Sequence, residues 1–232
     1  MKLANALLVL AVTLAPGVVG ADAPQRSTKE ALQAFNDLIG SWRGTAVPGG
    51  SSEDQRRGFW TETINWQWQF KGQDAWLKVD FDKSKQFQSG TLRYLPEKDL
   101  YQLTVLTPAK ETQTFTGQLA KRVLTLQREA PEEKQRLIVT LLHANRFLYR
   151  YEVQPKGKSL YSMRFKVGAT KEGVPFAAGD GKPECIVSGG LGTIPVSFNG
   201  VTYYVCCSGC KEAFNENPAK FVKEWEAKKG KK

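Results

Sequence analysis

The four cysteines of this 232-residue chain lie close together near its C-terminal end, at Cys185, Cys206, Cys207 and Cys210. Disulfide bonds that hold a whole fold together are spread along a chain, so this clustering indicates one local site. Three thiolates without a histidine form a soft donor set, which favours Cu(I) in trigonal geometry or Zn(II) with a fourth ligand. We therefore predict a site for Zn(II) or Cu(I) made by Cys185, Cys206 and Cys210. Cys207, solvent or a partner's side chain could supply the fourth ligand.

The segment around these cysteines predicts the elements that position them. Asn199-Gly200 separates two strand-like runs, and this pair is a strong hairpin signal because both residues tolerate a positive φ. The second run leads into Cys206, and a helix is expected to begin near Cys210, where the helix dipole lowers the pKa of a thiol. Asn217-Pro218 is typical of the start of a further helix. A unit of about 50 residues has a small core, so we expect it to need a metal or disulfides for stability.

The cysteine spacing, with twenty residues between Cys185 and Cys206 and three between Cys206 and Cys210, resembles that of the TRASH and YHS metal-binding domains. The run 201–221 also has their aromatic residues before the second cysteine, their Cys-Lys-x-x-Phe and their Asn-Pro. The resemblance covers about 45 residues and implies a treble-clef-like fold and heavy-metal binding, often in copper or zinc handling. Where these domains commonly have Cys-Gly-Met, this chain has Cys185-Ile186-Val187, so a thioether ligand is absent there.

Two other interpretations of the cysteines belong to different classes of protein. Exported proteins with an even number of cysteines commonly form disulfides, and a bridge from Cys185 to Cys206 or Cys210 would hold the hairpin without a metal. Cys207 and Cys210 also have the Cys-x-x-Cys spacing of thiol redox proteins at a helix start. The βαβ unit that usually surrounds such a redox pair has no counterpart in this sequence. Metal binding is therefore the preferred interpretation.

Residues 40–168 read as about ten short strands that recur every 8–12 residues. The clearest strand has Ile64, Trp66, Trp68 and Phe70 on one face, alternating with polar residues. Such a regular series closes most simply as an up-and-down barrel, which removes the exposed sheet edges. The predicted fold is mainly β, an antiparallel up-and-down β-barrel of about ten strands followed by a small α+β, treble-clef-like cysteine module.

The interior of such a barrel is a candidate ligand site. An eight-stranded barrel is just filled by side chains and larger ones leave space, so about ten strands predict a cavity for an apolar small molecule, lined by the face of Ile64, Trp66, Trp68 and Phe70. The Gly40-Ser41-Trp42 start resembles the Gly-x-Trp opening of lipocalin-like and nitrobindin-like barrels, which implies an apolar or haem-like ligand. The preferred interpretation of Trp42 itself is that it plugs the end of the barrel. The one histidine is expected in a turn, away from the interior, so haem is not predicted.

The remaining sequence predicts the order of segments and the route out of the cell. A basic start, an apolar stretch and the small residues Val19-Gly20-Ala21 are typical of a cleaved signal peptide, and a retained membrane anchor is the alternative. A glycine-rich stretch separates the two folded units. We expect a signal peptide at 1–21, a helix leading into the barrel at 22–39, the barrel at 40–168, a linker at 169–182, the cysteine module at 183–227 and a basic tail at 228–232.

Charge and motif content limit the function further. The formal net charge is +10, but an exported protein seldom meets nucleic acid, so no nucleic-acid partner is predicted. The lysine-rich tail could contact an anionic membrane surface weakly. The sequence shows no convincing catalytic constellation and identifies no protein partner. We therefore predict a non-enzymatic metal-binding protein, periplasmic or secreted, for metal sequestration, sensing or delivery.

Overall fold

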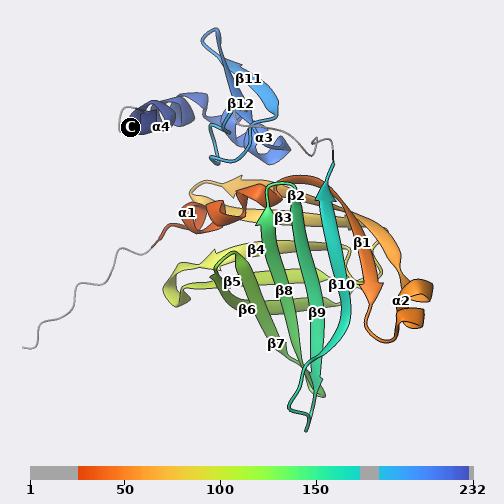
Figure 1. The fold of residues 1–232 in the computed structure, drawn as a ribbon. Helices are drawn as coiled ribbons and strands as arrows, with labels where there is room; N and C mark the ends of the chain where they lie inside the picture. Colours follow the sequence, from red (N-terminus) through yellow and green to blue (C-terminus); the bar gives the residue numbers. More distant parts are fainter. Residues whose placement is uncertain (1–25, 173–182, 230–232) are drawn as a thin grey trace, which may run out of the picture.

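The computed structural model describes residues 26–172 and 183–229. Within the first of these ranges, ten antiparallel strands form a closed barrel, and each strand pairs with its neighbours in sequence. The first strand pairs with both the second and the last, and this pairing closes the barrel (Figure 1). The strands are β1 (Gly40–Pro48), β2 (Trp60–Lys71), β3 (Asp74–Asp82), β4 (Ser89–Leu95), β5 (Leu100–Leu106), β6 (Thr112–Ala120), β7 (Val123–Glu129), β8 (Glu133–His143), β9 (Arg146–Pro155) and β10 (Ser162–Lys171). The predicted mainly β fold with an antiparallel barrel of about ten strands is confirmed.

One end of the barrel is closed by the segment that precedes β1. Helix α1 (Thr28–Leu32) begins at a capping box in which Ser27 and Glu30 bond to each other's backbone N–H groups, and the 3₁₀ helix η1 (Gln33–Leu38) follows it. The side chains of Leu32, Phe35 and Leu38 are buried and join the barrel core. Apolar burial of this kind is the main force that holds a short helix in place, because a helix of so few turns is unstable alone.

Trp42 lies at the same closed end, fully buried. Its indole Nε1 donates a hydrogen bond to the Leu38 carbonyl oxygen at 2.6 Å, and its ring packs edge-on against Phe147 with centroids 4.8 Å apart. The tryptophan of the Gly-x-Trp opening therefore joins the barrel wall to the segment formed by α1 and η1, here called the plug. This agrees with the structural role considered for Trp42.

One helix of the barrel was not expected from the sequence. Helix α2 (Ser52–Gly58) lies between β1 and β2, and it has no buried residue, so it carries no apolar periodicity that could predict it. A capping box between Ser51 and Asp54 defines its start. The spacing of these two residues is the signal that could have predicted the helix. A 3₁₀ turn, η2 (Pro96–Lys98), connects β4 and β5.

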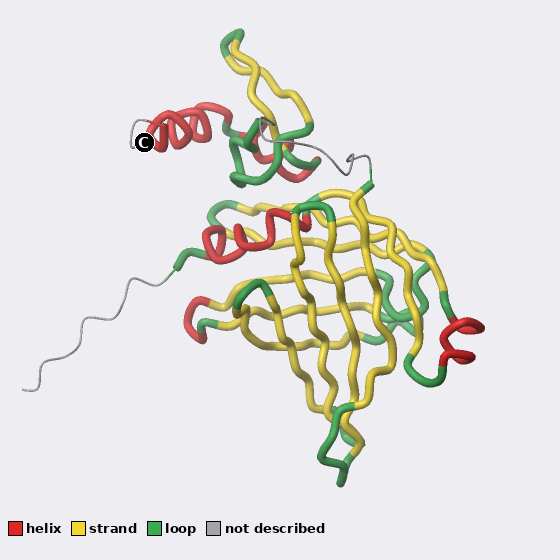
Figure 2. The backbone as a smooth tube through the Cα atoms, viewed as in Figure 1, coloured by secondary structure: helices red, strands yellow, loops and turns green. Residues whose placement is uncertain are grey.

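The C-terminal segment consists of a hairpin and two helices, drawn in yellow and red above the barrel in Figure 2. The strands β11 (Ile194–Phe198) and β12 (Val201–Val205) pair around Asn199-Gly200, whose φ angles of 50° and 77° are those of the expected tight turn. Helix α3 (Ser208–Glu216) follows the hairpin directly, and helix α4 (Pro218–Lys229) ends the described chain.

Two expected boundaries differ from the structure. Strand β10 continues to Lys171, beyond the limit placed at residue 168, because its backbone still pairs with β1 there. Helix α4 continues to Lys229, so the first residues of the expected basic tail are helical. The expected signal peptide at 1–21 and most of the expected linker lie outside the described residues. Within the described ranges, no helix is both long and apolar enough to cross a membrane.

Candidate metal centre

Three thiols converge in the C-terminal segment. The sulfur atoms of Cys185, Cys206 and Cys210 all lie within 4.8 Å of one another, and those of Cys206 and Cys210 are 3.5 Å apart. Two thiolates on one tetrahedral zinc, each at about 2.3 Å, would lie about 3.8 Å apart, so this spacing fits a shared ion. The side chains are nearly inaccessible, with relative exposures of 0%, 8% and 0%. All four cysteines of the chain are free thiols in this structure.

Each of the three thiols comes from a different element. Cys185 starts a tight loop in which its N–H donates to the Gly190 carbonyl at 2.6 Å and its carbonyl accepts from the Gly189 N–H at 2.8 Å. Gly189 has a φ of 77°, a conformation that costs glycine little. Cys206 follows the last residue of β12, and Cys210 lies in the first turn of α3. The hairpin thus carries the chain from one sulfur to the next.

Ser188 is a residue of this centre that the sequence did not reveal. Its backbone N–H donates to the Cys185 sulfur at 3.4 Å, and its Oγ lies 3.4 Å from the Cys206 sulfur. The side chain is fully buried, which is unusual for a serine and indicates that its polar groups are used. Groups that bond to metal ligands in this way orient them and tune the metal, but they leave no mark on cysteine spacing.

Cys207 occupies a separate position. It is the N-cap residue of α3, and its sulfur lies 3.8 Å from that of Cys206. It falls outside the group of three whose sulfurs are all within 4.8 Å of one another. The geometry therefore brings together three of the four predicted sulfur ligands and places the fourth, Cys207, next to this group but outside it.

The thiols share protons through their mutual hydrogen bonds. Bonds from Cys206, and then from Cys210, lower the pKa of Cys185, and the same two thiols lower the pKa of Cys207. Burial raises the pKa of Cys210 well above its usual range, so the lowering expected from the helix dipole at this position is wrong for this structure. A buried set of this kind can lose some of its protons but resists full ionisation until a cation compensates the charge. Its donor chemistry therefore fits a soft metal ion.

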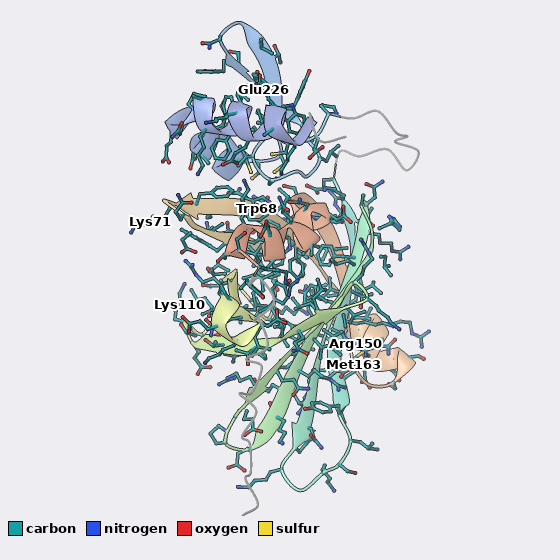
Figure 3. The ribbon with its side chains drawn as sticks, turned by 90° about the vertical axis from the view of Figure 1, so that its left-hand side faces the viewer. Trp68, Lys71, Lys110, Arg150, Met163 and Glu226 are labelled. Atoms are coloured by element: carbon teal, nitrogen blue, oxygen red, sulfur yellow. The ribbon has the colours of Figure 1, made fainter. Side chains whose placement is uncertain are left out.

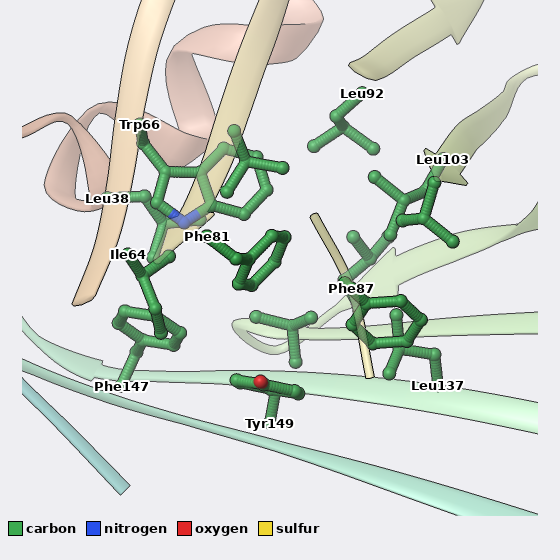
Figure 4. A pocket seen from close by; sticks show the side chains of 14 residues that line it. Leu38, Ile64, Trp66, Phe81, Phe87, Leu92, Leu103, Leu137, Phe147 and Tyr149 are labelled. Carbon is green, nitrogen blue, oxygen red and sulfur yellow. The ribbon is translucent and has the colours of Figure 1, made fainter. Parts of the chain in front are cut away.

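The barrel interior differs from the expected ligand cavity. Ile64 and Trp66 do line it, together with twelve other side chains drawn in Figure 4, but the space left is only about 30 Å³. Space of this size holds water-sized molecules only. The prediction of a roomy cavity from strand number is wrong for this structure because aromatic rings fill the lumen. The lining rings are Trp66, Phe81, Phe87, Phe147 and Tyr149.

Trp68 and Phe70, the other two predicted lumen residues, do not line this space. Their rings stack with centroids 5.5 Å apart, and the Trp68 indole Nε1 donates to the Asn36 Oδ1 at 3.0 Å. Figure 3 shows Trp68 at the end of the barrel that faces the cysteine segment. The same period-two face of β2 therefore serves the interior in its first part and the outer end of the barrel in its second.

Polar groups inside the barrel are few. Glu62 is buried and accepts hydrogen bonds from the Trp60 indole Nε1 at 2.8 Å and from the Tyr149 hydroxyl. The Trp66 indole Nε1 points into the pocket and is the buried side-chain donor without a hydrogen-bond partner among the described residues (Figure 4). His143 lies exposed at the end of β8, as expected for a residue in a turn.

Fold and site together define a class of protein, a closed ten-stranded antiparallel β-barrel with a small C-terminal segment that carries a cysteine cluster. No protein-family model matches the chain, and no curated protein matches its sequence. The barrel and the cysteine cluster by themselves therefore define the class of protein and no narrower family.

Proposed function

We propose that this is a non-enzymatic metal-binding protein that holds one Zn(II) or Cu(I) ion through Cys185, Cys206 and Cys210. The observation that carries the proposal is the convergence of three buried sulfurs within 4.8 Å. Grouping several buried thiolates is costly unless a cation compensates their charge, and a soft cation is the partner that such a donor set prefers. The TRASH- and YHS-like run around Cys206 and Cys210 supports the same chemistry.

The biological role follows from where such a centre would work. The proposed signal peptide at 1–21 takes the chain out of the cytoplasm. The protein would then sequester, sense or deliver Zn(II) or Cu(I) in the periplasm or outside the cell. A bound metal would also add folding free energy to a segment whose own core is small. The buried position of the sulfurs suits retention of an ion more than rapid turnover.

The test is metal content and thiol state of the full chain, purified under reducing conditions and loaded with Zn(II) or Cu(I). The wild type should bind one ion per chain, and Cys206→Ser or Cys210→Ser should abolish tight binding because each removes a ligand. Cys207→Ser is the matched control, because it removes a thiol from the same segment outside the group of three. It should keep one ion per chain.

The rival interpretations make different predictions for the same samples. A stapled fold would show two disulfides in the mass spectrum of native protein and full stability in a strong chelator, and that result would overturn the metal proposal. A redox pair of Cys207 and Cys210 would make Cys207→Ser inactive in thiol exchange. Their exposures of 7% and 0% leave little surface for a substrate to reach either sulfur.

A further inference from the structure

The cysteine segment rests directly on the barrel. The first turn of α3 lies against β2, where a Cβ atom on Gly209 would come within 1.6 Å of the Trp68 carbonyl oxygen. Since that oxygen belongs to the strand backbone, it cannot move aside, and glycine is the residue that permits this approach. Beside it, the Ser208 Oγ lies 3.2 Å from the Gln67 Oε1. The glycine within Cys-x-x-Cys thus serves contact with the barrel.

A second contact joins the plug of the barrel to the loop that carries Cys185. The side-chain amides of Asn36 and Gln33 donate to the Ser188 carbonyl oxygen at 2.9 and 3.1 Å. Asn36 also accepts the hydrogen bond from the Trp68 indole, so its orientation is fixed from the barrel side. Ser188 in turn touches two of the three sulfurs. A continuous hydrogen-bonded path therefore runs from β2 of the barrel to the thiols.

A third contact lies further along the same face. The Lys29 ammonium is 3.7 Å from a carboxylate oxygen of Glu224 and lies over the Phe221 ring, 5.4 Å from its centroid. Burial lowers the pKa of Lys29, as expected for a cation enclosed between α1 and α4. Both helices of the cysteine segment are therefore held by the barrel, and not by the chain connection alone.

We infer that the end of the barrel is part of the metal centre, with Asn36 and Gln33 as positioning residues that hold Ser188 against the sulfurs. The inference rests on the proposed function. Groups that bond directly to metal ligands, as Ser188 would, commonly change metal affinity 10- to 100-fold, and Asn36 and Gln33 act through Ser188. By thermodynamic linkage, if docking on the barrel strengthens metal binding by some factor, metal binding strengthens docking by the same factor.

The experiment compares Zn(II) affinity of full-length variants by competition with a chromophoric chelator. Asn36→Leu removes the bond to Ser188, and Gly209→Ala obstructs the contact with Trp68. Each should lower the affinity several-fold, up to about tenfold, while one ion per chain still binds at saturation, because each acts on the sulfurs only through Ser188 or helix α3. The matched control is Gly168→Ala in β10, where an added Cβ meets only a Leu148 methyl group at 3.5 Å. It should bind Zn(II) as tightly as the wild type.

A second readout separates positioning from a general loss of fold. In the wild type, Zn(II) should shift the ¹⁵N–¹H signal of the Trp68 indole, because its acceptor Asn36 is tied to the metal loop. Asn36→Asp keeps the acceptor for Trp68 but sets an oxygen against the Ser188 carbonyl. It should weaken Zn(II) binding and abolish the shift, although the barrel signals stay dispersed. Gln33→Ala removes one donor from an otherwise intact contact and should weaken binding several-fold.

The outcomes distinguish the two proposals. A wild type that binds no Zn(II) and no Cu(I) would overturn the proposed function and this inference with it. Tight binding in the wild type, with unchanged affinity in Asn36→Leu, Gly209→Ala and Gln33→Ala, would overturn the inference alone. The module would then be an independent metal-binding unit on a barrel that only carries it.

Discussion

Ser188 shows how a single residue can serve two partners at once. Its N–H and Oγ face the sulfurs of Cys185 and Cys206, and its carbonyl faces the amides of the barrel plug. A thiolate bound to a metal still carries negative charge, so a hydrogen bond to it is charge-assisted and stronger than a neutral one. The hydroxyl of Ser188 should therefore contribute to metal affinity, although it is not itself a ligand.

Removing this hydroxyl gives a prediction for a single atom. Ser188→Ala should lower Zn(II) affinity about tenfold, about 1.4 kcal/mol, because the hydroxyl's contact with the Cys206 sulfur and its bond from the Gly190 N–H are lost, whereas the bonds of the Ser188 backbone remain. The measurement is chelator competition on the full chain, with circular dichroism to check the fold. Ser197→Ala, an exposed serine of β11 in the same segment, is the control. Equal affinities for the two variants would show that the hydroxyl does not act on the metal.

At the scale of elements, β2 is the strand that serves both parts of the protein. Trp66 fills the lumen with an exposure of 5%, and Trp68, two residues further, reaches the plug below the cysteine segment. The lumen is nearly full, so its residues act as core. The indole N–H of Trp66 is buried without a partner among the described residues, which costs about 1–3 kcal/mol and offsets part of what its ring contributes.

This balance predicts the order of two substitutions. Trp66→Ala should lower the free energy of unfolding by about 3–5 kcal/mol, because it leaves a cavity among the lining side chains. Trp66→Phe should cost much less, because it keeps most of the apolar contact and removes the unpartnered N–H. Chemical denaturation of metal-loaded protein measures both, with Trp76→Phe, a partly buried tryptophan on the neighbouring strand β3, as the control. A cost for Trp66→Phe as large as that of Trp66→Ala would contradict this balance between ring packing and the unpartnered N–H.

The elements that local sequence predicts well are those whose signals lie within a few residues. Alternation marked the barrel strands, and Asn199-Gly200 marked the hairpin turn. The lumen volume was not predictable, because it depends on how rings from many strands fill a shared space. The docking contacts were not predictable either. Asn36 and Ser188 are 152 positions apart, and nothing in either residue's neighbourhood indicates the other.

For the whole molecule, the sequence suggested two folded units separated by a glycine-rich stretch. Units joined only in this way would leave the barrel folded when the cysteine module loses its metal. The contacts of Lys29, Asn36 and Trp68 with the cysteine segment indicate a different behaviour. The free energy of metal binding stabilises whatever must be ordered for the ion to bind, by about 2.7 kcal/mol at one hundred times the dissociation constant. If the barrel end is part of the metal centre, as inferred above, it is among the parts that the metal stabilises.

Segment-resolved hydrogen exchange, with and without a strong chelator, tests this directly. Chelation should reduce the protection of backbone amides from exchange in 183–216, because the thiolates repel one another or take up protons once the ion is gone. It should also reduce protection in 33–38 and around Trp68, because these residues lose the segment that docks on them. Strands β6 and β7 contact neither α1 nor the cysteine segment in the described structure to any comparable degree, so their protection should stay unchanged. Loss confined to 183–229 would show that the barrel is indifferent to the metal. Loss of protection across all ten strands would show that barrel and module unfold as one cooperative unit. Only loss in 183–216, in 33–38 and around Trp68, with β6 and β7 unchanged, agrees with a centre shared between the module and one end of the barrel.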